Sequence, residues 1–237
     1  MAKSRVGFGR IIAKSEKDRE FLLPFKRRGS GVITQKTWWT PKPCYDQGAT
    51  SECVAYSAVR YLTTNPIRNK PLNFREFYNE CKKNDEWPGE SYDGTSVRAA
   101  FKVFKERGYV SEYRWAFDFE PVIAHLLMVG PVVMGTYWTP TMSNVRDDGY
   151  VEVGHIKEED DGHAWLLIGA NRKRRNYDGT VGACRGINSW GDGWGIKGRF
   201  WITFKDLDRL IKADGEACVA TEVLLANLRA ATTTALA

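Results

Sequence analysis

A cysteine that opens a predicted helix is the feature that most constrains this chain of 237 residues. Cys53 follows the run Gln47-Gly48-Ala49-Thr50-Ser51-Glu52, and apolar residues then recur at three-to-four spacing as far as Asn65-Pro66. This spacing predicts a helix over residues 53–64, with Ser51 placed to cap it. A thiol at the start of a helix lies near unpaired backbone N–H groups and the positive end of the helix dipole, and both stabilise a thiolate. The pattern is therefore typical of a nucleophilic cysteine.

The composition is that of a globular protein large enough for one core or for two lobes that share a cleft. Hydrophobic residues make up 43% of the chain and charged residues 27%, which excludes a disordered chain. The net charge of +6 is concentrated in residues 1–43, which carry eleven Lys and Arg against three Asp and Glu. Because the remainder is slightly acidic, we do not expect a nucleic-acid partner. The basic arm of residues 1–43 could regulate access to a site, bind an acidic partner, or do neither.

Cysteine usage and hydropathy predict the cellular setting. The chain has five cysteines, an odd number, and none is spaced as in a metal site. No apolar stretch approaches the ~20 residues of a membrane span, and no apolar region follows the N-terminal charges as in a secretion signal. We therefore expect a cytoplasmic protein with reduced thiols, no cofactor, no metal and no membrane contact. A phage-encoded or virion-associated protein fits the same observations.

Hydrophobic periodicity divides the chain into a mainly helical half and a strand-rich half. Helices are predicted over residues 53–64, 74–82, 96–107 and 123–129, and strands over 132–138, 164–170, 185–189 and 198–204. Residues 171–180 have the composition of an exposed hairpin loop. We predict an α+β fold with a basic arm (1–43), a helical lobe (44–122), a β-rich lobe (123–224) and a C-terminal tail (225–237).

Three histidines are candidates for the base that a nucleophilic cysteine needs. His125 lies inside an apolar run, as a buried structural histidine does, and His155 lies in a loop. His163 directly precedes a predicted apolar strand, which would fix its position. Asn188 ends another strand and is followed by Trp190, so it could orient an imidazole. A glycine-rich turn and a structural strand-edge histidine are the alternative interpretation of these residues.

Three blocks of the sequence resemble those of the papain-like cysteine peptidases. They are Gln47-Gly48 with Cys53-Val54-Ala55-Tyr56-Ser57-Ala58, then Gly162-His163-Ala164 before an apolar strand, and Asn188-Ser189-Trp190-Gly191 with Gly193-Trp194-Gly195. The blocks occur in the order of the family over residues 41–205. The resemblance is to a non-secreted, bacterial- or phage-type member without the long helical inhibitory propeptide. It implies a two-lobed fold, with the nucleophile helix in one lobe, a β-barrel-like second lobe, and the active-site cleft between them.

The resemblance also implies roles for individual residues in a thiol-dependent peptidase. Cys53 would be the nucleophile, resting as a thiolate beside the imidazolium of His163. The side chain of Asn188 would orient that imidazole, with Trp190 covering the contact and lining the substrate site. Gln47 and the backbone N–H of Cys53 would form the oxyanion hole.

A peptide or protein substrate would lie extended along the cleft. The resemblance places Gly94 on the cleft wall, where it would pair with the substrate backbone. Gly135 and Ala164 would line the pocket for the second residue before the scissile bond.

The chain departs from the family pattern beside the nucleophile. Thr50-Ser51-Glu52-Cys53-Val54 stands where the family commonly has Cys-Gly-Ser-Cys-Trp. Thr50 removes a cysteine that makes a disulfide in secreted relatives, whereas the carboxylate of Glu52 would disfavour a thiolate. Two alternatives therefore stay open. One is a papain-fold structural or binding protein with weak or no hydrolysis, and the other is an acyl transferase that uses the same residues.

Four acidic residues, 158–161, lie just before His163. They are either a solvated loop or a group that raises the imidazolium population and favours basic substrates.

Overall fold

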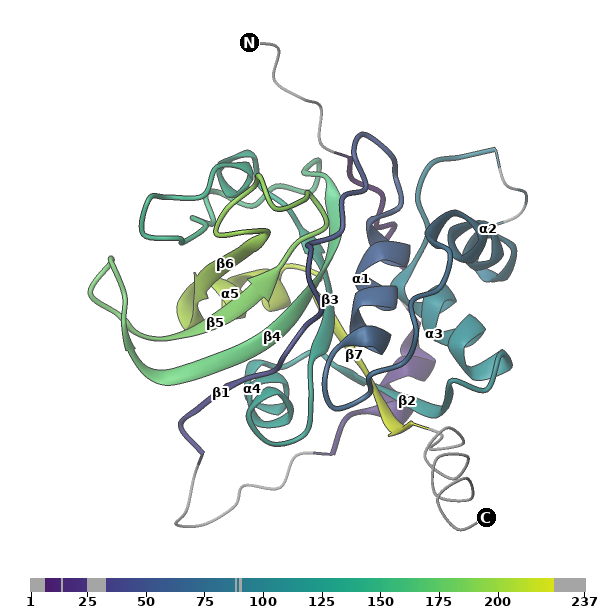
Figure 1. The fold of residues 1–237 in the computed structure, drawn as a ribbon, viewed down its shortest axis with the longest axis horizontal. Coiled ribbons are helices and arrows are strands. Elements are labelled where there is room, and N and C mark those ends of the chain that lie inside the picture. The colour runs from purple at the N-terminus through teal and green to yellow at the C-terminus, as the bar shows by residue number, and fades with distance from the viewer. Residues whose placement is uncertain (1–6, 14, 25–32, 88, 90, 224–237) are drawn as a thin grey trace.

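The computed structural model describes residues 7–13, 15–24, 33–87, 89 and 91–223 (Figure 1). The helices in this part of the chain are α1 (Cys53–Thr63), α2 (Phe74–Asn84), α3 (Val97–Glu106), α4 (Phe119–Met128) and α5 (Phe204–Lys212), with 3-10 turns η1 (Glu16–Phe21) and η2 (Pro140–Ser143). The strands are β1 (Gln35–Thr37), β2 (Val110–Ala116), β3 (Val132–Tyr137), β4 (Gly162–Arg175), β5 (Val181–Ile187), β6 (Arg199–Thr203) and β7 (Glu216–Val223).

These strands form one antiparallel sheet in the order β2-β7-β3-β4-β5-β6, with β1 also paired to β4. In Figure 1, α1, α2 and α3 lie on one side of the molecule and strands β4, β5 and β6 extend away from them. The architecture is the two-lobed α+β fold that the sequence predicts.

The alternation of side chains along the central strands creates two hydrophobic cores. Val133 on β3 and Leu166 on β4 pack with residues of α1, α2 and α3. The next residue on β3, Met134, and the preceding residue on β4, Trp165, pack instead with residues of α4 and α5. Successive side chains of a strand point to opposite faces, so helices cover both faces of the middle of the sheet. This double coverage is why the predicted strands read as continuous apolar runs.

The sequence predicts the first three helices to within two residues at each end. The expected cap is wrong, however, because Glu52 and not Ser51 is the N-cap of α1, and its side chain makes no capping hydrogen bond. Helix α4 begins at Phe119, four residues before the predicted start, since Pro121 is tolerated in a first helical turn. None of the helices in the described residues is long and apolar enough to cross a membrane.

Several elements in the second half differ from the prediction. Strand β4 continues to Arg175 through the segment predicted as a loop, and the hairpin turn is confined to Asn176–Thr180. Helix α5 was not predicted, although its buried Leu207, Leu210 and Ile211 recur at helical spacing. Strands β2 and β7 pair with each other, so part of the predicted helical lobe joins the sheet. The predicted tail at 225–237 lies outside the described residues.

Candidate active site

Cys53 begins α1 at the point where this helix packs against β4. Its side chain is fully buried, and the backbone N–H of Ala164 donates to the sulfur at 3.4 Å. Ala164 is the second residue of β4, so the strand places the residue after His163 directly against the thiol. Two elements far apart in sequence thus bring Cys53 and the predicted histidine together.

His163 is held by Asn188, as the sequence predicts. Nε2 of His163 lies 2.8 Å from Oδ1 of Asn188, and the same oxygen accepts a hydrogen bond from the backbone N–H of Ser189. The backbone N–H of Asn188 donates to Gly198 O at 2.8 Å, which fixes the segment after β5. The rings of Trp190 and Trp138 lie 5.0 and 4.9 Å from the imidazole. The His–Asn contact is therefore closed off from solvent.

Gln47 connects the loop before α1 to the loop that carries Asn188. Its Oε1 accepts a hydrogen bond from the Ser189 hydroxyl at 2.6 Å, and its backbone N–H donates to Ser189 O. Its Nε2 donates to Thr50 O at 2.6 Å and to Gly7 O at 3.2 Å. The side-chain amide of Gln47 thus already binds a peptide carbonyl, and that carbonyl belongs to the N-terminal arm of the chain.

The arm occupies the candidate site from Gly7 to Ile11. Gly7 O also accepts a hydrogen bond from the indole N–H of Trp190 at 3.3 Å. The ring of Phe8 meets the imidazole of His163 edge-on, with 5.5 Å between the centroids. The backbone N–H groups of Gly9 and Arg10 donate to Gly162 O. The arm therefore covers the candidate site.

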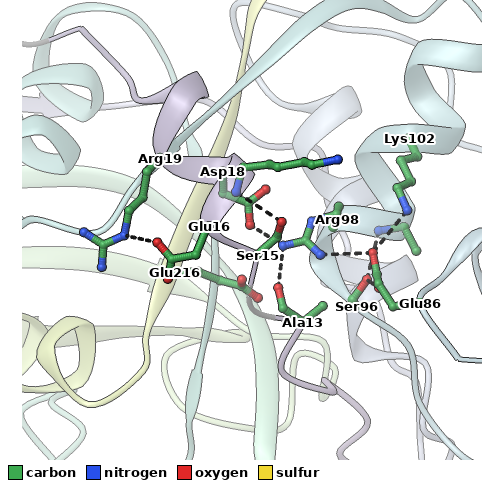
Figure 2. A network of polar contacts seen from close by, with 12 residues as sticks. Ala13, Ser15, Glu16, Asp18, Arg19, Glu86, Ser96, Arg98, Lys102 and Glu216 are labelled. Carbon is green, nitrogen blue, oxygen red and sulfur yellow. Dashed lines mark hydrogen bonds and ion pairs between the residues drawn. The ribbon is translucent and has the colours of Figure 1, made fainter.

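A second anchor holds the arm further along. Figure 2 shows Arg98, on α3, reaching to the carbonyl of Ala13 and to the carboxylate of Asp18 on η1. The opposite nitrogen of the same guanidinium donates to Glu86 at 3.2 Å. Because Arg98 and Asp18 are both largely buried, this ion pair fixes where η1 lies against the helical side of the molecule.

Burial keeps the candidate catalytic pair neutral. Burial raises the pKa of the Cys53 thiol to about 12, although the N–H groups of Ala164 and Val54 and the charge of Arg10 act in the opposite direction. Burial lowers the pKa of His163 to about 4, partly offset by its hydrogen bond to Asn188. The expected thiolate–imidazolium pair is therefore not the favoured state in this covered form.

Comparisons with known proteins place this geometry in a structural family. No protein-family model and no curated protein matches the sequence. The structure is similar to xylellain, a cysteine protease from Xylella fastidiosa, with a TM-score of 0.68 and 16% identity over 94% of this chain and 99% of that chain. It is also similar to digestive procathepsin L2 proteinase from Tenebrio molitor larval midgut, with a TM-score of 0.63 and 18% identity over 91% of this chain and 78% of that one. The chain has the papain-like cysteine peptidase fold.

A third structure, proCathepsin B S9 from Trypanosoma congolense, has a TM-score of 0.59 and 15% identity over 93% of this chain and 87% of that chain. At such identities the likeness shows the papain-like fold alone. The roles of individual residues therefore depend on the geometry of this chain.

Of the four predicted substrate-binding residues, Gly94, Gly135 and Trp190 lie against the arm, and Ala164 lies against Cys53. A Cβ added to Gly94 would lie 2.4 Å from Gly9 O, so a glycine is required where the arm passes. The backbone pairing itself is made by the next residue, Thr95, which exchanges hydrogen bonds of 2.9 Å with Gly9 O and the N–H of Ile11. Gly135 pairs with Ala164 across β3 and β4, beside Cys53. Trp190 contacts the arm at Gly7.

Sequence reasoning missed Glu216, the first residue of β7, whose side chain is buried against Arg10 of the arm. An isolated acidic residue at a strand end carries no signal of such a contact. Ser189, which binds Gln47, lies inside the asparagine block and could have been inferred from it.

Three further sequence predictions concern His125, the acidic run at 158–161 and Glu52. His125 is buried on α4, in agreement with a structural role, and burial lowers its pKa to about 4. The acidic run at 158–161 does not raise the pKa of His163, which moves in the opposite direction because of burial. Glu52, which would disfavour a thiolate, forms an ion pair with Arg75.

Proposed function

We propose that this protein is a cysteine peptidase that cleaves peptide bonds through an acyl-enzyme on Cys53. One observation carries the proposal: the imidazole of His163 is held at 2.8 Å by Asn188, next to the residue whose N–H contacts the Cys53 sulfur. Cysteine, histidine and asparagine in this arrangement supply a nucleophile, its base and the group that orients the base. Peptides or proteins are the proposed substrates.

His163 Nδ1 is the ring nitrogen available to the thiol. Nε2 is engaged by Asn188, whereas Nδ1 has no hydrogen-bond partner among the described residues. In the proposed reaction Nδ1 takes the thiol proton, and the sulfur of Cys53 forms a bond to the substrate carbonyl carbon. The imidazolium then protonates the leaving amine as the peptide bond breaks, and water releases the acid and restores the thiol.

Gln47 would stabilise the negative charge that develops on the substrate oxygen. Its Nε2 already donates to the carbonyl of Gly7 in the covered form, which supports a role as an oxyanion donor. The backbone N–H of Cys53, at the start of α1, would be the second donor. Loss of one such donor costs about 3 kcal/mol, so we expect Gln47→Ala to reduce the rate by about a hundredfold or more.

Selective alkylation tests this proposal. Because Gly7 and Phe8 cover the site, the experiment uses both the natural chain and the full-length variant Gly7→Val, in which the added Cβ would lie 1.9 Å from Thr50 O. In Gly7→Val, iodoacetamide at neutral pH should label Cys53 at least tenfold faster than Cys184, which is equally buried in the natural chain and serves as the matched thiol.

Labelling of Cys53 should be lost in His163→Ala, and hydrolysis of a peptide library should be lost in Cys53→Ala but kept in Cys184→Ala. Equal and slow labelling of both thiols, without hydrolysis, would instead support a binding or structural protein. Formation of amide products with an added amine, in place of free acids, would identify an acyl transferase.

A further inference from the structure

Three arginines gather around Trp201 on the strands that extend away from the helices α1, α2 and α3 (Figure 1). Arg185 on β5 pairs directly with Trp201 on β6, and Arg199 precedes Trp201 by two residues on the same strand. The guanidinium groups of Arg174 and Arg185 lie over the indole ring, 4.1 and 5.1 Å from its centroid. Because alternate residues of a strand share a face, these side chains form one cluster, which we call the arginine cluster.

The arginine cluster has no carboxylate to balance its charge. Arg174, Arg185 and Arg199 form no ion pair with another described residue, whereas Arg172 on the same hairpin pairs with Glu120. Within the described part of the chain, the guanidinium of Arg185 makes no hydrogen bond either, and its contact is with the indole ring. Burial lowers the pKa of Arg185, and the charges of Arg199 and Arg174 act in the same direction. The sheet thus holds three like charges close together without compensation.

Hydrogen bonds fix two of these arginines in place. Nε of Arg174 donates to the hydroxyl of Tyr150 at 2.7 Å, and that hydroxyl donates to Oδ1 of Asn176 at 2.7 Å. Nη2 of Arg199 donates to Oγ1 of Thr40 at 2.9 Å. A guanidinium has five N–H donors, so both side chains keep donors for a further acceptor. Because the side chains are already ordered, an anion that binds them loses little side-chain entropy.

The exposure of the cluster distinguishes it from ordinary surface arginines. A fully exposed arginine needs no partner, because water solvates its charge. Arg174, Arg185, Arg199 and Trp201 are instead all half-buried. Their guanidinium groups have lost part of their hydration and still reach solvent, so contact with an anion stabilises them more than it would at a fully exposed site.

The strand register gives the spacing of the charges. Since Arg185 pairs with Trp201, Arg185 and Arg199 are diagonal neighbours on adjacent strands, about 7–8 Å apart. In an extended peptide, alternate residues point to the same side and lie about 6.8 Å apart. Carboxylates at alternate positions of such a peptide therefore match the two guanidinium groups. The planar fork of each arginine can bind a carboxylate through two parallel hydrogen bonds.

The aromatic rings of this face favour a carboxylate partner over a nucleic acid. Proteins that bind single-stranded nucleic acid offer rings on which the bases stack. Here the Trp201 ring already has two guanidinium groups over it, Tyr150 is buried, and the guanidinium of Arg146 lies 4.1 Å from the centroid of the Tyr177 ring. Little ring surface is left for bases, so the face is suited to negative charge alone.

We propose that the arginine cluster binds an acidic segment of a partner protein, in extended form and with Asp or Glu at alternate positions. Arg185 and Arg199 bind two successive carboxylates on one side of the segment, and the free donors of Arg174 add to the positive charge beside them. Binding at the cluster requires no hydrolysis, so it is tested separately from the proposed peptidase activity.

Fluorescence anisotropy tests the proposal on the full-length chain carrying Cys53→Ala, in which the probes stay intact. The probe is a labelled peptide with three glutamates at alternate positions between serines, and a second peptide has glutamine in place of each glutamate. We expect the glutamate peptide to bind at least tenfold more tightly, since a hydrogen bond between charged groups is worth roughly tenfold to a hundredfold. Its affinity should fall as salt is added.

The variants Arg185→Gln and Arg174→Gln should each weaken binding of the glutamate peptide by roughly tenfold. They lie on different strands, so one tests the cluster if the other does not fold. Arg172→Gln is the matched control, because it removes the same charge from the same hairpin at an arginine that pairs with Glu120. It should change the affinity by less than about twofold. Equal losses in Arg172→Gln and Arg185→Gln, or equal binding of the two peptides, would overturn the proposal.

Two further measurements distinguish the acidic segment from other occupants. A labelled single-stranded DNA that binds more tightly than the glutamate peptide, and loses affinity in Arg185→Gln, would overturn the proposal in favour of a nucleic acid. Sedimentation of the natural chain tests a second copy, whose largely exposed acidic run at 158–161 is the alternative occupant. Self-association that is lost in Arg185→Gln would overturn the separate partner, whereas a monomer that binds the glutamate peptide supports it.

Discussion

The carboxylate of Glu52 is paired with the guanidinium of Arg75, with 2.6 Å between the two charged groups. Glu52 is buried, whereas the side chain of Arg75 is 61% exposed. Both residues line a cavity of about 530 Å³ that Cys53 does not line. The charge beside the proposed nucleophile is therefore compensated by Arg75 of α2, at a cavity that Cys53 does not line.

This pairing predicts a difference between two variants. Arg75→Ala leaves a buried acceptor without its partner, so we expect a loss of about 1–3 kcal/mol in the free energy of unfolding. It should also slow alkylation of Cys53, since an uncompensated carboxylate disfavours the thiolate. Glu52→Gln should leave the alkylation rate nearly unchanged in the natural background and restore it in Arg75→Ala. Urea unfolding and iodoacetamide labelling measure both effects, with the exposed Glu76→Gln as control. Equal labelling in Arg75→Ala and the natural chain would contradict the compensation.

Gly7 is the position where a small change should open the site. A Cβ at Gly7 would lie 1.9 Å from Thr50 O, so Gly7→Ala forces the arm off the loop before α1. Overpacking of this kind costs about 1–3 kcal/mol, which corresponds to roughly a tenfold to hundredfold shift toward the open form. The alkylation rate of Cys53 should rise by the same factor. Gly193→Ala is the matched control, because a Cβ there contacts nothing within 4 Å. If both variants behave like the natural chain, the arm does not control access to the thiol.

Arg98 should hold the arm at its second anchor. Arg98→Met removes the guanidinium that binds the Ala13 carbonyl and the Asp18 carboxylate. Hydrogen bonds to a charged group contribute about 1.5–3 kcal/mol, and in this variant the lost bonds are those that hold η1 against α3. We expect faster cleavage of the arm by an added protease and faster alkylation of Cys53. Arg107→Met, at the end of the same helix and paired with Glu80, is the control that leaves the arm untouched. Unchanged digestion in Arg98→Met would mean that the anchor does not hold η1.

The helix that begins at Cys53 and the histidine–asparagine pair could be located from the sequence because local signals mark them. Cys53, His163 and Asn188 each lie at an end of a helix or strand, where chain polarity and flanking apolar residues fix the position. Their order along the chain matches the papain-like pattern, so resemblance and periodicity agree. Gly135 and Ala164, which the resemblance assigns to a substrate pocket, pair with each other across β3 and β4.

The long-range contacts around the candidate site could not be predicted from local signals in the sequence. The ion pair of Arg10 and Glu216 joins residues 206 positions apart, and no periodicity carries information over that separation. The pKa directions of Cys53 and His163 depend on their burial, which arises only when the helices and the sheet are packed together. The ion pair between Glu52 and Arg75 could not be predicted for the same reason, since it depends on how α2 packs against α1.

Protonation of His163 should favour loss of the covered form in acid. Burial lowers the pKa of His163 to about 4, whereas an unfolded histidine titrates near 6.5. Because the folded state binds this proton more weakly, its contribution to stability is fully present above pH 6.5 and is lost as the pH falls from 6.5 toward 4. The full difference corresponds to about 3 kcal/mol.

Urea unfolding at several pH values, compared between the natural chain and His163→Gln, isolates this contribution because the carboxylates are common to both. The natural chain should lose about 3 kcal/mol more than His163→Gln over this range. His125→Gln gives an independent check, since His125 is buried on α4 and its pKa is also lowered to about 4. Adding Gly7→Val should reduce the His163 contribution and keep that of His125, because Phe8 of the arm packs against the imidazole of His163. The same pH dependence with and without the arm displaced would show that the burial of His163 does not come from the arm.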